Sequence, residues 1–206
     1  IRRIALGDLV HRTAQKYGAR IAVVDGDVRL SYTELDARSS RFAHYLLEHV
    51  GSGCQVGMLC QNSADMMVAY NAIHKAGCVW VPVNIKLDAA AIAYVLGHAE
   101  VSAVVVDEAL QADPALRAVL DKLAVPRLLT MATGPAADGA LTLAQAESGG
   151  SDALPEVTID GAQPALIMYT SGTTGHPKGV VHSHASVASA LLGNVAGFAI
   201  TERDVF

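Results

Sequence analysis

The chain has 206 residues, and its 15 Lys and Arg against 20 Asp and Glu give a formal net charge of −5. This length allows one large domain or two small ones with a buried core. Hydrophobic residues make up 51% and charged residues 17%, a balance that excludes an intrinsically disordered chain. The negative net charge argues against electrostatic binding to the phosphate backbone of DNA or RNA, so we expect no nucleic-acid partner.

The sequence carries no signal for membrane insertion or secretion. No apolar run reaches the roughly 18 residues of a membrane-spanning helix, and no basic stretch, apolar core and small-residue cleavage site opens the chain. Cys54, Cys60 and Cys78 are odd in number and lack Cys-x-x-Cys spacing, which argues against a disulfide framework or a zinc knuckle. We therefore expect a cytoplasmic protein with no membrane span, in which the cysteines are buried packing residues.

The first third of the chain predicts a helix, a hairpin and a second helix. Apolar residues at helical spacing predict the first helix over residues 6–17. Two β-rich runs, residues 21–24 and 28–30, flank an Asp-Gly-Asp turn and predict a β-hairpin.

Ser31 and Glu34 have the spacing of a capping box, which predicts that the second helix begins there. Apolar residues repeat along one face of this helix. We expect it to pack on that side only, because its other face is polar. The polar face carries Asp36, Arg38, Arg41 and His44.

From residue 56 onward, short apolar strands alternate with helices. The strands are continuous apolar runs, so both faces of their sheet should be buried. The alternation predicts an α/β fold, with layered, parallel-rich sheets flanked by helices and joined by right-handed crossovers. The expected strands are residues 56–60, 78–83, 101–106 and 127–131, and the expected helices begin after Asn62 or Ser63, after Asp88 and at Pro114.

The alternation stops at residues 132–163, which are rich in Gly, Pro, Ala, Ser and Asp. We interpret this segment as a loop or linker with a short helical turn at residues 141–146. The predicted organisation is a first α/β subdomain over residues 1–131, this linker, and the start of a second part over residues 164–206. The chain opens without Met and stops in what reads as another strand, so we expect it to be part of a longer protein.

A loop rich in glycine and hydroxyl groups lies between two further apolar strands, residues 165–169 and 180–182. Its sequence from Tyr169 is Tyr-Thr-Ser-Gly-Thr-Thr-Gly-His-Pro-Lys-Gly, which contains one Lys and no acidic residue. Glycines let the backbone expose N–H groups and let a ligand approach closely. Charge-assisted hydrogen bonds, about 1.5–3 kcal/mol each, make such a loop suited to polyphosphate oxygens.

The spacing differs from that of a Walker A loop, in which Gly and four residues precede a Gly-Lys-Ser/Thr that opens a helix. Here Gly172 and Gly175 are three apart, and Lys178 is followed by Gly179 and an expected strand. A kinase or GTPase is therefore disfavoured. The remaining structural alternative is a polar hairpin that binds nothing.

Two further constellations are interpreted as packing residues. His182 and His184 could share one face of a strand and hold a metal, but no Cys, Asp or Glu lies near them in the sequence. Met66, Met67 and Trp80 are predicted to lie in the core.

Residues 169–181, with His184 after them, resemble the signature loop of the adenylate-forming, or AMP-binding, enzymes. This superfamily comprises acyl- and aryl-CoA synthetases, peptide-synthetase adenylation domains and luciferases. Residues 30–35 are similar to the family's first helix entry, and residues 75–84 are similar to its Lys-Ala-Gly and Val-Pro core segment. The resemblance covers nearly the whole chain, is closer to the CoA synthetases, and implies the incomplete large N-terminal domain of such an enzyme.

The resemblance implies an AMP-forming ligase of fatty or aromatic acid metabolism. A carboxylic acid and ATP would give an acyl-adenylate and pyrophosphate, and the acyl group would then pass to the thiol of coenzyme A, with Mg²⁺ assisting. By motif position, Lys178 is the expected catalytic residue. It is expected to bind the β- and γ-phosphates together with three hydroxyl residues, Ser171, Thr173 and Thr174. Three glycines are expected to supply flexibility and backbone amides, namely Gly172, Gly175 and Gly179, and Thr170 is expected to contact Mg²⁺ or a water bound to it.

The family's adenine, ribose and acyl pockets, its acidic Mg²⁺ ligand and a late catalytic lysine come from motifs absent from residues 1–206. We therefore expect this chain alone to be inactive and a C-terminal part of the same protein to be its partner. Two alternatives stay open: an adenylation domain that loads a carrier-protein thiol, and a non-catalytic nucleotide-binding or interaction module.

Overall fold

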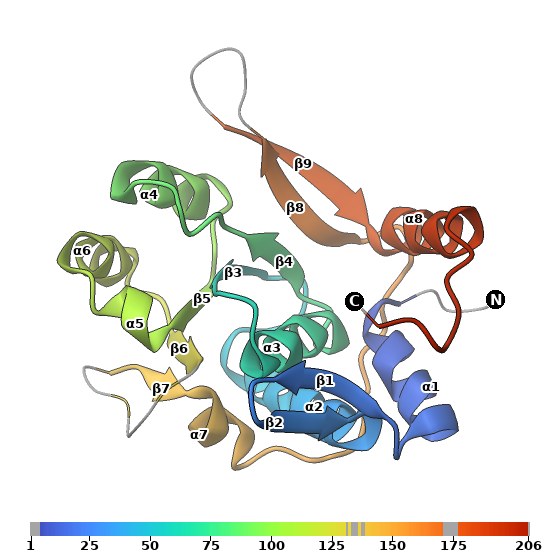
Figure 1. Cartoon of the computed structure of the whole chain (residues 1–206). Helices are drawn as coiled ribbons and strands as arrows, with labels where there is room; N and C mark the ends of the chain where they lie inside the picture. The colour runs from blue at the N-terminus through green and yellow to red at the C-terminus, as the bar shows by residue number, and fades with distance from the viewer. Residues whose placement is uncertain (1–4, 131, 133–135, 137–138, 171–176, 206) are drawn as a thin grey trace.

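The computed structural model describes residues 5–130, 132, 136, 139–170 and 177–205, which form a seven-stranded sheet and a separate two-stranded hairpin (Figure 1). The large sheet contains β3 (Gln55–Leu59), β4 (Val79–Pro82), β5 (Ala103–Asp107), β6 (Arg127–Thr130), β7 (Leu141–Thr142), β8 (Pro164–Thr170) and β9 (Lys178–Ser183). Its strand order is β7-β6-β5-β3-β4-β8-β9, and every neighbouring pair is parallel except β8 and β9. The predicted parallel-rich α/β fold is confirmed.

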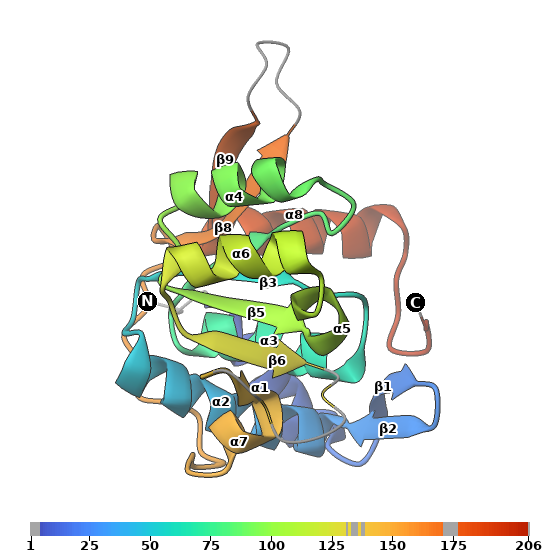
Figure 2. The ribbon, with the colours of Figure 1, turned by 90° about the vertical axis from the view of Figure 1, so that its left-hand side faces the viewer.

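Helices cover both faces of the sheet (Figures 1 and 2). One buried core joins the sheet to α1 (Gly7–Tyr17), α2 (Tyr32–His49), α3 (Ala64–Lys75) and α7 (Leu143–Glu147). The other core joins it to α4 (Ala89–His98) and α6 (Pro114–Leu123), with α5 (Glu108–Gln111) just after β5. Residues 103–106 of β5 alternate between the two cores and are all buried, which explains why this run is continuously apolar. No helix formed by the described residues is both long and apolar enough to cross a membrane.

Side chains at the predicted positions begin the helices. Ser31 and Glu34 form the capping box of α2, and the Ser63 hydroxyl accepts a hydrogen bond from the Met66 N–H at the start of α3. The small hairpin, β1 (Ile21–Asp25) and β2 (Val28–Ser31), packs against α2 and α3. After β9 the chain enters α8 (His184–Gly197).

The prediction that α2 packs on one side only is wrong. Its polar face lies against α3, α7 and the segment after α7. The Arg38 guanidinium donates to both oxygens of Glu147, at 2.7–3.1 Å, and to Asp65 at 3.0 Å. A polar helix face is therefore not always exposed to solvent, because neighbouring helices that carry oppositely charged side chains can cover it.

Residues 132–163 contain more structure than a linker with one helical turn. Leu141 and Thr142 form β7, which pairs in parallel with β6 and extends the sheet. Thr142 and Gln145 then form a capping box that starts α7. The division into two subdomains stays a prediction, and the sheet itself joins residues from both sides of this segment through the pairing of β4 with β8.

Three helices meet at the buried Lys75. Its ammonium group donates to the backbone oxygen of Asp36 at 2.7 Å, to the Asp36 carboxylate at 2.6 Å and to the Ser40 hydroxyl at 2.9 Å. The same carboxylate contacts His11 of α1 at 2.9 Å. Burial lowers the pKa of Lys75, and the hydrogen bond and charge of Asp36 oppose that shift.

A second buried contact joins the amino-terminal segment to α3 and α8. His184 accepts a hydrogen bond from the Leu6 N–H through Nδ1, at 3.3 Å, and its ring meets that of His74 edge to face at 5.9 Å. Burial, with a smaller effect of His184, lowers the pKa of His74 to about 3. The prediction that His184 is a packing residue is confirmed, although it begins a helix and not a strand.

Other packing predictions were partly wrong. Cys78 is buried, but Cys54 and Cys60 are half-buried. Met66, Met67 and Trp80 are also half-buried, because they pack against the core from the wall of a cleft.

We predict that Asp36→Ala lowers the free energy of unfolding by about 3 kcal/mol, because it leaves the Lys75 ammonium buried without its carboxylate. Urea denaturation measures this change. Glu48→Ala is the matched control, since Glu48 is exposed on the same helix and should change stability by no more than about 0.5 kcal/mol. Equal losses in the two variants would show that the buried ion pair does not stabilise the fold.

The lowered pKa of His74 also predicts a pH dependence. The unfolded chain takes up a proton on this residue near pH 6.5 while the folded chain resists it down to about pH 3. His74 therefore stabilises the fold fully above pH 6.5, and this contribution is lost as the pH falls, by about 3 kcal/mol at pH 4. Urea unfolding of His74→Leu should show a weaker pH dependence than the unmodified chain, whereas the exposed-site variant His49→Leu should not. Parallel pH profiles for His74→Leu and the unmodified chain would contradict this prediction.

Candidate functional site

The two strands that flank the glycine-rich loop form an antiparallel hairpin at one end of the sheet (Figure 1). Their register places Thr170 directly opposite Lys178, and Tyr169 opposite Gly179. Opposite residues in such a pair have Cα atoms about 4.5–5.5 Å apart and side chains on the same face of the sheet. Thr170 and Lys178 are both exposed. The structure thus places a residue with a hydroxyl group and a residue with an ammonium group opposite each other where the loop begins and ends.

The remaining predicted phosphate ligands fall within the loop. Ser171, Gly172, Thr173, Thr174 and Gly175 lie outside the described residues. Their roles therefore rest on motif position, whereas Thr170, Lys178 and Gly179 have a defined place in the hairpin.

Tyr169 attaches this hairpin to helix α4. Its hydroxyl group shares a hydrogen bond of 2.7 Å with Nδ1 of His98, and the two rings meet edge to face at 5.8 Å. His98 also stacks on Tyr94, one helical turn earlier. Burial raises the pKa of Tyr169, and Tyr94 adds to that shift. The strand that leads into the loop is thus held by a helix more than seventy residues away in the sequence.

Gly179 leaves room for the Tyr169 ring to cross the neighbouring strand. A Cβ atom at this position would lie 3.0 Å from Cγ2 of Ile167 and 3.1 Å from Cζ of Tyr169. We expected Gly179 to supply flexibility and a backbone amide. Its described surroundings give a further reason for glycine, since any side chain would press on the residue that anchors the loop.

The described residues do not form a Mg²⁺ site by themselves. Thr170 offers one hydroxyl oxygen, and no group of three or more His, Cys, Asp or Glu in the described part of the chain could hold a metal ion. Mg²⁺ is commonly bound by one or two carboxylates together with substrate phosphates and waters. Thr170 fits a contact to an ion carried by a nucleotide better than a site that holds the ion alone.

The sequence pattern does not identify two residues of this site, Tyr94 and His98. They belong to an alanine-rich helix, and nothing in its spacing connects them to Tyr169. The aromatic character of Tyr94 and His98, one turn apart near the end of a helix, was the one available sign.

A family model and individual relatives all match this chain over most of its length. The family model for AMP-binding enzymes matches residues 10–206. The medium/long-chain-fatty-acid–CoA/3-oxocholest-4-en-26-oate–CoA ligase of Mycobacterium marinum is 30% identical over 196 residues, which is 91% of this chain and 36% of that protein. Tyrocidine synthase 2 of Brevibacillus parabrevis is 35% identical over 186 residues, which is 89% of this chain and 5% of that protein.

Solved structures agree with the sequence comparison. ATP-bound MatB from Rhodopseudomonas palustris aligns with a TM-score of 0.79 at 28% identity, covering 97% of this chain and 39% of that one. The chain therefore spans only part of these proteins, 36% of the Mycobacterium marinum ligase and 39% of the MatB chain.

We predict that Gly179→Ala lowers the free energy of unfolding by about 1 kcal/mol, because the new methyl group overlaps Ile167 and the Tyr169 ring. Gly193→Ala is the matched control. A Cβ at Gly193, on helix α8, meets no atom within 4 Å, so this change should raise stability by about 0.5–1 kcal/mol. Chemical denaturation of both variants measures the difference, and a gain in both would show that the close packing at Gly179 is absent.

Proposed function

The chain belongs to the family of AMP-binding enzymes, and we propose that it supplies the phosphate-binding hairpin of an ATP-dependent ligase that joins a carboxylic acid to the thiol of coenzyme A. The observation that carries this proposal is the pairing of Thr170 with Lys178 at the mouth of the loop. A compact ammonium group and a hydroxyl group, held on an anchored strand pair, suit the oxygens of a polyphosphate.

In the first step, a carboxylate oxygen attacks the α-phosphorus of ATP, and the bond to pyrophosphate breaks with its electron pair going to pyrophosphate. Negative charge grows on this leaving group. The Lys178 ammonium would stabilise that charge, and so would hydroxyl and amide donors from the loop. The product is an acyl-adenylate. In the second step the thiol of coenzyme A gives its proton to solvent, the resulting thiolate attacks the acyl carbonyl carbon, and AMP leaves with the electron pair of the bond that breaks.

The other assignments follow the motif. We propose that Ser171, Thr173 and Thr174 bind the β- and γ-phosphates with Lys178, and that Gly172, Gly175 and Gly179 supply close backbone amides. Thr170 is the proposed contact to Mg²⁺ or to a water on it, and the ion supplies positive charge next to the phosphates when it is bound.

The acceptor thiol has two candidate sources. Coenzyme A is supported by the relatives that are CoA ligases, among them FadD13 of Mycobacterium tuberculosis at 34% identity. A carrier-protein thiol is supported by the 35% identity to tyrocidine synthase 2. Assaying both thiols with a protein that includes this chain separates the two, and thioester formation on the carrier alone would contradict the coenzyme A proposal.

We also propose that the chain by itself binds ATP without turning it over, since it spans 36% of the Mycobacterium marinum CoA ligase. Its expected place is the cytoplasm, and its expected partners are the acid, coenzyme A and the rest of a longer protein. The second candidate function is a nucleotide-binding module without catalysis. Pyrophosphate exchange by a protein containing the hairpin and the remaining family motifs would contradict that second candidate.

We predict that Lys178→Ala weakens ATP binding by about tenfold or more, because one charge-assisted contact of about 1.5–3 kcal/mol is lost. Isothermal titration calorimetry with ATP and Mg²⁺ on this chain measures the effect. Lys122→Ala is the matched control, because Lys122 is an exposed lysine on α6, outside the hairpin. Equal affinities for Lys178→Ala and Lys122→Ala would overturn the assignment of Lys178.

A further inference from the structure

A second concave site lies at the carboxyl ends of β3 and β4. The chain leaves β3 towards α3, which packs in one core, and leaves the adjacent β4 towards α4, which packs in the other. When the connections from adjacent parallel strands depart to opposite faces, a crevice opens between the strand ends, and α/β proteins commonly bind ligands there. This crevice has a chemistry different from that of the loop after β8.

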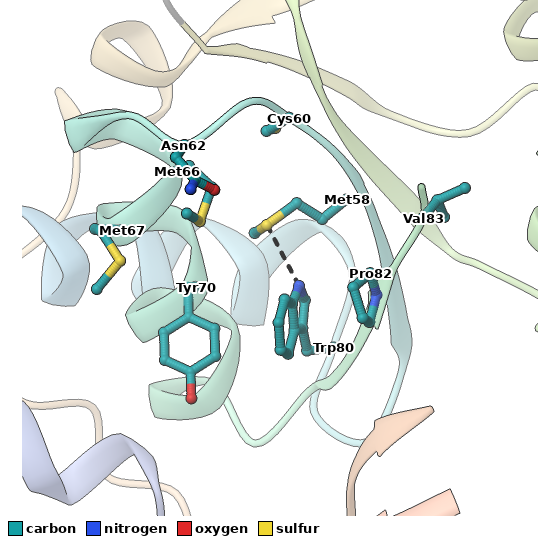
Figure 3. A pocket seen from close by; sticks show the side chains of 9 residues that line it. All are labelled: Met58, Cys60, Asn62, Met66, Met67, Tyr70, Trp80, Pro82 and Val83. Atoms are coloured by element: carbon teal, nitrogen blue, oxygen red, sulfur yellow. Dashed lines mark hydrogen bonds between the residues drawn. The ribbon is translucent and has the colours of Figure 1, made fainter. Parts of the chain in front are cut away.

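The apolar part of the crevice has a volume of about 460 Å³ (Figure 3). Met58 and Trp80 come from the sheet, and Met66, Met67 and Tyr70 come from α3. A polar part of about 490 Å³ adjoins it and shares Cys60, Asn62 and Val83 with it. The two parts together form one cleft, apolar at one end and polar at the other.

The apolar end is held open by contacts between its own walls. The Trp80 indole N–H donates to the sulfur of Met58 at 3.3 Å, as Figure 3 shows, and the ring of Tyr70 meets that of Trp80 edge to face at 4.9 Å. Burial raises the pKa of Tyr70. These contacts fix the aromatic rings without filling the space between them, so the cleft is formed before a ligand arrives.

The loop at the polar end is also fixed. The buried Asp107 carboxylate at the end of β5 accepts hydrogen bonds from the Gln61 N–H at 2.7 Å and from the Thr130 hydroxyl at 2.6 Å. The exposed amide side chains of Gln61, Asn62 and Asn84 border this end. The polar end therefore offers neutral donors and acceptors on a fixed loop.

Among the residues that the structure describes, none with a charged side chain lines either part of the cleft. A phosphate or a carboxylate would lose its hydration here without gaining a partner of opposite charge. We propose that the cleft binds a small uncharged ligand with an apolar body and one hydroxyl or amide head, of the class of medium-chain alcohols. The body lies on Met67, Tyr70 and Trp80, and the head meets the amides at the polar end. Methionine and aromatic side chains suit an aliphatic body because they adapt to its shape.

Trp80 provides a direct readout, because it is the one tryptophan in the sequence. Titration of the chain with 1-octanol should shift the tryptophan emission in a saturable way. Octanoate has the same chain length but carries a charge at pH 7.5, so it should bind at least about tenfold more weakly. An emission that does not saturate with 1-octanol, or equal affinities for the two compounds, would overturn the proposal.

A charge placed in the cleft gives a second test. Met67→Asp should weaken 1-octanol binding by about tenfold. Met168→Asp is the matched control, because Met168 is 44% exposed on β8 and does not line the cleft; it should leave the affinity unchanged. Equal affinities in the two variants would place the bound alcohol elsewhere and contradict the proposal.

A third test needs no variant and so does not depend on folding of Met67→Asp. Cys60 lines the cleft, whereas Cys54 does not, and both are half-buried. Burial raises the pKa of Cys60 to about 12, so its reaction with N-ethylmaleimide is slow and is followed over long exposures by peptide mass spectrometry. Saturating 1-octanol should slow this reaction several-fold further, while the rate at Cys54 stays constant. Unchanged labelling of Cys60 under saturating alcohol would refute the assigned site.

Discussion

Parallel pairing of β8 with β4 decides where this molecule can do chemistry. The contact between Trp80 and Leu166 in this register makes β8 run in the same direction as β3, β4, β5 and β6. All these strands therefore end at one edge of the sheet, and the chain leaves β8 for the glycine-rich loop at that edge. The position of the glycine-rich loop depends on this alignment, because an antiparallel β8 would carry the loop to the opposite edge. The cleft lies where β3 and β4 end, at the same edge as the loop.

Polar contacts between helices hold the layer that supports this edge. Lys75 joins α3 to α2 through Asp36, and Arg38 joins α2 to both α7 and α3 through Glu147 and Asp65. Apolar packing alone would allow these helices to slide along one another, whereas a buried ammonium group needs its carboxylate at one register. On the other face, His98 of α4 holds Tyr169, so this layer of helices contributes to the position of the hairpin.

Local patterns in the sequence predicted the elements well. The capping box at Ser31, the cap placed at Asn62 or Ser63 and the two strands that flank the glycine-rich loop were all correct, because each depends on residues a few positions apart. Contacts between distant residues were not predicted. No repeat in the sequence indicates the hydrogen bond between His98 and Tyr169. The polar face of α2 predicts exposure to solvent, because the sequence does not show that α7 packs against it. The sequence predicted Trp80 to be a core residue. It could not show the cleft beside Trp80, because that cleft depends on the path of the chain after β3 and β4.

The hairpin of β8 and β9 is the place where we propose that a nucleotide binds. Amide NMR spectra of the ¹⁵N-labelled chain, recorded during titration with ATP and Mg²⁺, test this claim most directly. We expect the largest shifts among described residues at Thr170, Lys178 and Gly179, with Met67 and Asn84 in the neutral cleft unchanged. Saturating ATP that shifts the cleft residues and leaves the hairpin unchanged, or that shifts neither, would contradict the claim.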